Sequence, residues 1–118
     1  MMCCQGPITI RHLLSHSSGL SYGLLDPGTT LYTAYTGRKV LNSTSTLADM
    51  MDLLADLPLS FHPGTAWEYS VATDVLSRLV EVVSGERFDD FLQARVFGPL
   101  GMMDTGFVVP EDQQHRLV

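Results

Sequence analysis

The residue best suited to acid–base chemistry in this sequence is Tyr69. It follows a Pro63-Gly64 turn and precedes a long apolar segment with helical periodicity, so we expect its phenol to be held at a helix start, where it can relay a proton. A phenol has a reference pKa of about 10, so only about one molecule in a thousand is ionised at neutral pH unless a cation lies close. The only lysine, Lys39, has no evident reason in the sequence to lie beside it.

Two other groups of reactive side chains have structural explanations. His16 and Ser17 are neighbours, but adjacent side chains on a helix do not face each other, and the Gly-x-Ser-x-Gly turn found in many serine hydrolases is absent from the sequence. Cys3 and Cys4 are adjacent and pair only in strained geometry, so we expect exposed free thiols. His12 and His16 could in principle join them around a metal, but no ligand motif of recognised spacing is present. We therefore expect no metal site and no cofactor.

The composition indicates a small acidic domain. Its 118 residues suffice for one core, and with 45% hydrophobic and only 17% charged residues we expect part of its surface to be covered. The net charge is −6 and the basic residues are scattered, so we expect neither nucleic acid nor a membrane surface as a partner. No segment matches a membrane span or a signal peptide. We expect a soluble chain and leave its compartment unknown.

Hydrophobic periodicity predicts a mainly helical chain. Thr9 and Ser70 are suited to N-cap two of the helices, and Gly85 is suited to end one. Residues 21–45 are rich in Gly, Thr, Ser and Tyr without a sustained period, which predicts a long loop that lines or covers a site. We expect helices at 8–20, 46–57, 70–84 and 88–97, the start of a strand at 107–109, and a polar tail at 110–118.

Three stretches together resemble a known family. They are His12-Leu13-Leu14-Ser15-His16-Ser17-Ser18-Gly19-Leu20, Pro63-Gly64-Thr65-Ala66-Trp67-Glu68-Tyr69-Ser70, and Gly98-Pro99-Leu100-Gly101-Met102-Met103-Asp104-Thr105-Gly106-Phe107. In order and rough spacing they resemble the serine hydrolases of the class C β-lactamase and D-alanyl-D-alanine carboxypeptidase group, most closely the family VIII carboxylesterases. The resemblance covers residues 7–109; singly each stretch is weak, and jointly they are specific.

The resemblance implies a catalytic role for Tyr69. In that family the serine of a Ser-x-x-Lys motif attacks the carbonyl, and the lysine and a tyrosine share the proton transfers; by position that tyrosine corresponds to Tyr69. A nearby ammonium is what makes a neutral phenol a useful base, so Tyr69 requires a lysine partner. Val71 stands where β-lactamases of the group commonly carry an asparagine that touches the substrate amide. Since valine makes no hydrogen bond with its side chain, the resemblance favours the esterase branch.

The partner motif is absent from the sequence. No serine stands three residues before a lysine, and the one near miss, Thr36-Gly37-Arg38-Lys39, follows the His12 stretch, whereas the family's motif precedes it. The Lys-Thr-Gly triplet of the family's later strand is also missing. We therefore expect a fragment or truncated member of a serine hydrolase family that acts on carboxylic esters, β-lactams or D-Ala peptides through an acyl-enzyme. Alone it should be inactive.

The expected fold is mainly α: the partial helical region of the α/β fold of β-lactamases and transpeptidases. Residues 1–118 would form one partial domain, with 1–7 a non-matching N-terminal segment and 110–118 a tail. The complete enzyme would take a small ester or amide substrate, and the exposed apolar face of this part could mediate self-association. The alternatives are a non-catalytic helical binding module derived from that scaffold and a ligand-binding wall, formed by residues 21–45 and the tyrosine turn, without turnover.

Overall fold

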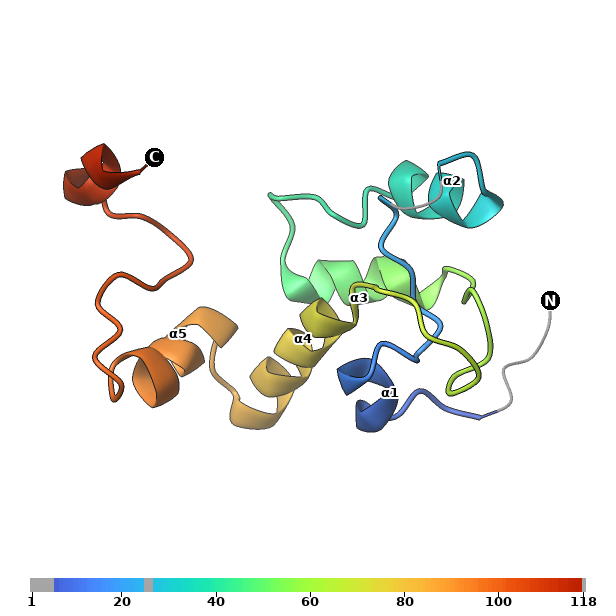
Figure 1. Ribbon diagram of the computed structural model, residues 1–118, viewed down its shortest axis with the longest axis horizontal. Helices are drawn as coiled ribbons and strands as arrows, with labels where there is room; N and C mark the ends of the chain where they lie inside the picture. Colours follow the sequence, from blue (N-terminus) through green and yellow to red (C-terminus); the bar gives the residue numbers. More distant parts are fainter. Residues whose placement is uncertain (1–5, 25–26, 118) are drawn as a thin grey trace. The chain divides into compact units, whose positions relative to one another are not determined.

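The computed structural model describes residues 6–24 and 27–117, and the chain divides into two compact units, Met1–Leu79 and Val80–Val118. Cys3 and Cys4, expected to be free thiols, lie outside the described residues. The part of the chain that is described contains helices and irregular segments but no strand (Figure 1). The prediction of a mainly helical chain is therefore confirmed. The elements are α1 (Ile10–Leu14), α2 (Thr30–Gly37), α3 (Leu47–Ala55), α4 (Ala72–Ser84), α5 (Phe88–Leu92), a π-helical segment η1 (Gln93–Phe97) and a 3₁₀-helix η2 (Glu111–Arg116).

Helix α1 begins where the sequence predicts and ends earlier. The Thr9 side chain accepts a hydrogen bond from the backbone N–H of His12, and His12 Nδ1 accepts one from the N–H of Thr9, which together make a capping box. The helix was expected to run on to about Leu20, but His16 has a φ of 51°. A left-handed residue cannot continue a right-handed helix, so α1 covers one turn and a half.

Helix α2 lies inside the segment for which we predicted only a loop, and that prediction is wrong. Thr29 caps it by accepting a hydrogen bond from the N–H of Tyr32. Within the helix, the Thr36 hydroxyl donates to the Tyr32 carbonyl. Its buried anchor is Tyr35, which is 1% exposed. A helix held by one buried aromatic residue has no repeating apolar stripe, and its threonines resemble loop composition.

Helix α3 confirms its prediction because its signals are local. Thr46 caps it, and Asp49 closes the capping box by accepting from both the N–H and the hydroxyl of Thr46. These hydrogen bonds, the side-chain one first, lower the pKa of Asp49. The buried face of α3 contributes to the core of the first unit, which consists of Leu13, Leu20, Tyr35, Val40, Met50, Leu54, Val71 and Ala72.

Helix α4 confirms the predicted long apolar helix, which ends at Ser84 with Gly85 in the left-handed conformation at φ 74°. Before it, an irregular segment lies alongside the segment that follows α1, shown yellow-green and blue in Figure 1. Backbone hydrogen bonds join them: the N–H of Ser60 donates to Gly19 O at 2.7 Å, and the N–H of Gly64 donates to Ser17 O at 2.7 Å. These two long irregular segments thereby hold each other in place.

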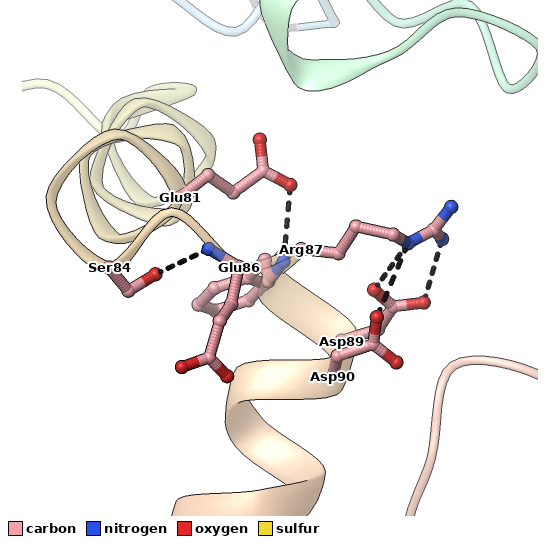
Figure 2. A network of polar contacts seen from close by, with 7 residues as sticks. Glu81, Ser84, Glu86, Arg87, Asp89 and Asp90 are labelled. Carbon is pink, nitrogen blue, oxygen red and sulfur yellow. Dashed lines mark hydrogen bonds and ion pairs between the residues drawn. The ribbon is translucent and has the colours of Figure 1, made fainter.

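The second unit opens on a polar network around the turn between α4 and α5 (Figure 2). Glu81 accepts from the N–H of Phe88 at 3.1 Å, and Arg87 donates through Nε and one terminal nitrogen to the two carboxylate oxygens of Asp89 at 3.0 and 2.8 Å. The guanidinium lowers the pKa of Asp89 by this hydrogen bonding. Arg87 supplies no side-chain cap, so the carboxylate of Glu81 serves the helix start instead.

The predicted fourth helix is present, but its second half is wider than an α-helix. The N–H of Gly98 donates to Gln93 O at 2.9 Å, which is the i to i+5 pairing of a π-helix. Beyond it, no strand forms at 107–109, where residues 107 and 108 make bends and residue 109 has no regular structure, so that prediction is wrong. The tail forms η2, and Arg116 donates to both oxygens of Asp104 at 2.6 and 2.9 Å. No helix among the described residues has the length and apolar character to cross a membrane.

Candidate active site around Tyr69

Tyr69 lies in the irregular segment just before α4, and its side chain is held between two other rings. Its ring centroid is 4.9 Å from that of His16 and 5.4 Å from that of Tyr22, with both pairs tilted by about 35°. The side chain remains 49% exposed. Tyr69 is therefore a fixed but accessible phenol, as a group that exchanges protons with a substrate must be.

His16 fixes this arrangement through both its backbone and its ring. Its carbonyl accepts from the N–H of Glu68 at 3.0 Å, and Nδ1 accepts from the N–H of Ser70 at 3.3 Å. The two residues that flank Tyr69 are thus both tied to His16. A backbone N–H can only donate, so Nδ1 must be unprotonated and the ring proton is on Nε2. The Ser70 hydroxyl also lies 3.3 Å from Nδ1, whereas the sequence suggested that this hydroxyl caps α4.

The left-handed conformation of His16 has a structural function here. Its φ of 51° turns the chain sharply after α1, and the chain then runs alongside the tyrosine segment. Gly19 follows with a φ of 83°, and a Cβ atom there would lie 2.3 Å from Phe61 O. Only glycine fits this crossing. The Tyr69 segment is therefore held by a turn and a close backbone contact, rather than by helix packing alone.

The other phenol near this region, Tyr35, is suited to a structural role. It is 1% exposed, and its hydroxyl oxygen accepts from the N–H of Ser21 at 3.2 Å. Burial raises the pKa of Tyr35, and Glu68 raises it further, while the Ser21 hydrogen bond lowers it. Tyr35 thus stays neutral in the core, and Tyr69 is the accessible phenol.

The near miss of the nucleophile motif does not form a site. The Thr36 hydroxyl donates to Tyr32 O at 2.8 Å, within α2. Lys39 follows the helix in a left-handed conformation, and within the described residues no ion pair or hydrogen bond links its side chain to Tyr69. No group of three or more His, Cys, Asp or Glu side chains among the described residues is arranged to hold a metal ion.

Two neighbours of Tyr69 differ in environment from what their sequence context suggests. Val71 is fully buried in the core, so its side chain packs and does not face a substrate. Trp67 is 69% exposed, although a tryptophan is usually well buried, and its ring meets that of His16 edge-on with a centroid distance of 6.3 Å. Sequence reasoning missed His16 and Tyr22, whose contacts with Tyr69 depend on residues about fifty positions apart.

Comparison with known protein families matches residues 4–118 to the family described as Beta-lactamase. The chain belongs to the beta-lactamase family. The prediction made from the three stretches is confirmed at this level, and so is the partial β-lactamase-like fold. The matched residues include both the tyrosine segment and the His16 turn described above.

Characterised relatives of this beta-lactamase family chain include esterases and acyltransferases. Lovastatin esterase of Penicillium rubens is 40% identical over 114 residues, which are 95% of this chain and 28% of the relative. Esterase EstB of Burkholderia gladioli is 40% identical over 112 residues, covering 91% and 28%. Monacolin J acid methylbutanoyltransferase of Aspergillus terreus is 34% identical over 121 residues, covering 95% and 28%. The chain thus spans little more than a quarter of the length of these relatives.

Solved structures give the same result. EstCE1, described as a hydrolase with promiscuous acyltransferase activity, aligns with a TM-score of 0.81 at 36% identity, covering 92% of this chain and 29% of that one. Unliganded simvastatin synthase from Aspergillus terreus aligns with a TM-score of 0.60 at 35% identity, covering 83% and 24%. The helical arrangement described above is therefore that of part of a β-lactamase-like fold.

Proposed function

We propose that this chain supplies the tyrosine-bearing part of the active site of a serine hydrolase that acts on carboxylic esters through an acyl-enzyme. The observation that carries the proposal is the half-exposed Tyr69 ring, held between His16 and Tyr22. A fixed, accessible phenol is what general acid–base catalysis needs. The nucleophilic serine and its lysine, implied by the family resemblance, are not among these 118 residues.

Tyr69 would move one proton in each half of the reaction. As a serine Oγ bonds to the ester carbonyl carbon, its proton passes to the tyrosine and lysine pair, and the same pair returns a proton to the alcohol as the ester C–O bond breaks. Water or a second alcohol then attacks the acyl group, loses its proton to the pair, and the serine oxygen regains one. The choice between water and an alcohol would separate hydrolysis from acyl transfer.

Two observations favour esters over β-lactams as substrates. Val71 is packed in the core and offers no polar group to a lactam amide. Relatives that are about 40% identical are named as esterases, and others as acyltransferases. An ester or activated acyl group is easier to cleave by proton relay than an amide, because its leaving alcohol needs less protonation.

A chimera tests the role of Tyr69. Residues 9–109 of this chain would replace the matching segment of EstCE1, and hydrolysis of p-nitrophenyl butyrate would be followed. Tyr69→Phe should lower kcat by about 10²- to 10⁴-fold, as expected for loss of a general acid–base group. Tyr32→Phe, which removes another phenol of the same unit, is the matched control and should leave kcat within twofold. Equal activity of the Tyr69→Phe and Tyr32→Phe chimeras would refute the proposal.

The chain by itself should show neither turnover nor a reactive serine. A fluorophosphonate probe should label no residue, and p-nitrophenyl butyrate should give no burst, because the attacking group is missing. Stoichiometric labelling of a serine in this chain would contradict the proposed division of the active site.

A second candidate is a non-catalytic module that binds through its apolar surface. The exposed side chains of Leu14 and Trp67 favour it, since exposed apolar surface of this kind usually meets a partner. We propose self-association as its simplest form. Sedimentation velocity should then show a mass that rises with concentration and falls back to the monomer in Trp67→Ser. A monomer at all concentrations would exclude self-association.

A further inference from the structure

Next to the Tyr69 site, the first unit contains a cavity of about 340 Å³ that the proposed proton relay does not use. Its accessible apolar walls come from Tyr22, Leu24 and Leu41, and Lys39 and Asn42 stand among its polar lining residues. The volume falls at the small end of the range of small-molecule sites, and a mostly apolar wall with a few polar groups is their usual composition.

Lys39 lines this cavity from a position where glycine is the usual residue. The N–H of Val40 donates to Tyr35 O and that of Lys39 donates to Thr36 O, which is the hydrogen-bond pattern of a Schellman motif at the end of α2. Lys39 has the left-handed φ of 53° that this motif requires. A non-glycine residue in this conformation is uncommon and strained, which makes the Lys39 side chain a candidate for a function.

The side chains of Lys39 and Asn42 offer hydrogen-bond donors to the cavity. The acceptor oxygen of Asn42 is already occupied. Oδ1 of Asn42 accepts from the N–H and the hydroxyl of Thr44 at 3.2 and 3.0 Å, so its amide nitrogen has two N–H groups to give. Lys39 adds an ammonium, and no ion pair or hydrogen bond of its side chain is found within residues 6–24 and 27–117. Donors from an ammonium and an amide favour a carboxylate.

Tyr22 connects this cavity to the proposed active site. Its ring lies 5.4 Å from that of Tyr69 and its side chain also lines the cavity. A molecule in the cavity would therefore contact the same aromatic residue that supports the proton-transfer phenol.

We propose that this cavity binds the carboxylate-bearing apolar part of an ester substrate, with the carboxylate on Lys39 and Asn42 and the apolar body against Tyr22 and Leu41. The proposal deepens the proposed function. Binding of a carboxylate in the cavity is independent of that function, but the identification of the bound molecule as a substrate rests on it. It selects a substrate class: esters in which the alcohol or the acyl portion is also an amphiphilic acid.

Octanoate and octanamide test the cavity in the chain as it exists, since they share shape and differ in charge. Heteronuclear NMR titration should show octanoate shifting the amides of residues 22–24 and 39–43, with octanamide binding more weakly. Lys39→Gln should weaken octanoate binding by about three- to tenfold, as for a partly exposed charged hydrogen bond, and leave octanamide unchanged. Arg38→Gln is the matched control: it removes the neighbouring cation, which pairs with Asp56 at 3.5 Å, and should leave both ligands unchanged.

Lys39→Gly guards against a folding artefact, because glycine relieves the left-handed strain while removing the ammonium. It should weaken octanoate binding as Lys39→Gln does. Equal binding of octanoate and octanamide, or equal losses in the Lys39→Gln and Arg38→Gln variants, would overturn the proposal. Because this assay needs no turnover, a failure of the Tyr69→Phe chimera would leave it standing, and the reverse also holds.

Discussion

Replacing His16 separates the two contacts by which it fixes Tyr69. His16→Phe keeps a ring of similar size beside Tyr69 but removes the Nδ1 acceptor, which leaves the N–H of Ser70 unpaired at a residue that is 2% exposed. His16→Asn does the opposite: Oδ1 can take the place of Nδ1, and asparagine tolerates the φ of 51° better than most residues. The pair therefore tests whether the hydrogen bond or the ring contact matters more.

The structure sets the expected magnitudes. An unpaired buried donor costs about 1–3 kcal/mol, and the 3.3 Å separation of Ser70 N and His16 Nδ1 places the loss in the lower half of that range. Phenylalanine in a left-handed conformation adds about 1 kcal/mol. Loss of the ring contact to a half-exposed tyrosine costs about 0.5 kcal/mol. We expect His16→Phe to lower the free energy of unfolding by about 2–3 kcal/mol and His16→Asn by about 0.5 kcal/mol.

Urea unfolding followed by far-UV circular dichroism measures both variants against the parent chain, provided that the m-values agree. In the EstCE1 chimera, His16→Phe should also lower kcat with little change in KM, while His16→Asn should retain most of kcat, because only the former frees the segment around Tyr69. If His16→Asn destabilises the chain as much as His16→Phe does, the ring contact dominates and the argument from the Nδ1 acceptor is wrong.

Three further predictions concern the same unit. Gly19→Ala should lower the free energy of unfolding by more than about 3 kcal/mol, because its Cβ would meet a carbonyl oxygen at 2.3 Å, whereas Gly28→Ala, with open space around it, should lose only about 1 kcal/mol; similar losses would contradict the close contact. Lys39→Gly should raise the melting temperature by relieving a left-handed residue, and a lower value would show that the strain is small. The pKa of Asp49 is lowered in the folded chain, so its contribution to stability is present above the unfolded pKa and is lost as the pH falls through the folded pKa. When the free energy of unfolding is measured against pH, Thr46→Val should lose less stability in acid than the parent chain. The same loss of stability in acid for both proteins would rule this contribution out.

The elements that could be predicted are those whose signals lie within one turn of helix. Thr46 and Asp49 are three residues apart and form a capping box that indicates the start of α3. The apolar stripe of α4 repeats over its whole length. Helix α2 escaped prediction because one buried tyrosine, Tyr35, holds it, and burial depends on the rest of the fold. The π-helical turn after α5 likewise has no local signature.

The candidate site divides in the same way. Tyr69 could be identified because its neighbours match a family pattern, but nothing in the sequence links it to His16, which is bonded to a residue 54 positions away. The left-handed conformation of Lys39 was equally hidden, since lysine is not the residue that the helix end favours. A local sequence pattern does not predict long-range contacts or strained residues.

The wide turn at Gln93–Phe97 gives that helix one residue that can be removed. A π-turn holds one residue more than an α-turn, so deleting Ala94 would allow a regular helix with better hydrogen bonds. Because the π-turn already accommodates the extra residue, the chain beyond the deletion would keep nearly the same orientation around the helix axis, and Phe107 would keep its partner Phe88, whose ring lies 5.9 Å away. The same deletion in the regular helix α4 would rotate every residue beyond it by about 100°, so single-residue deletions should be tolerated within Gln93–Phe97 and rejected in α4.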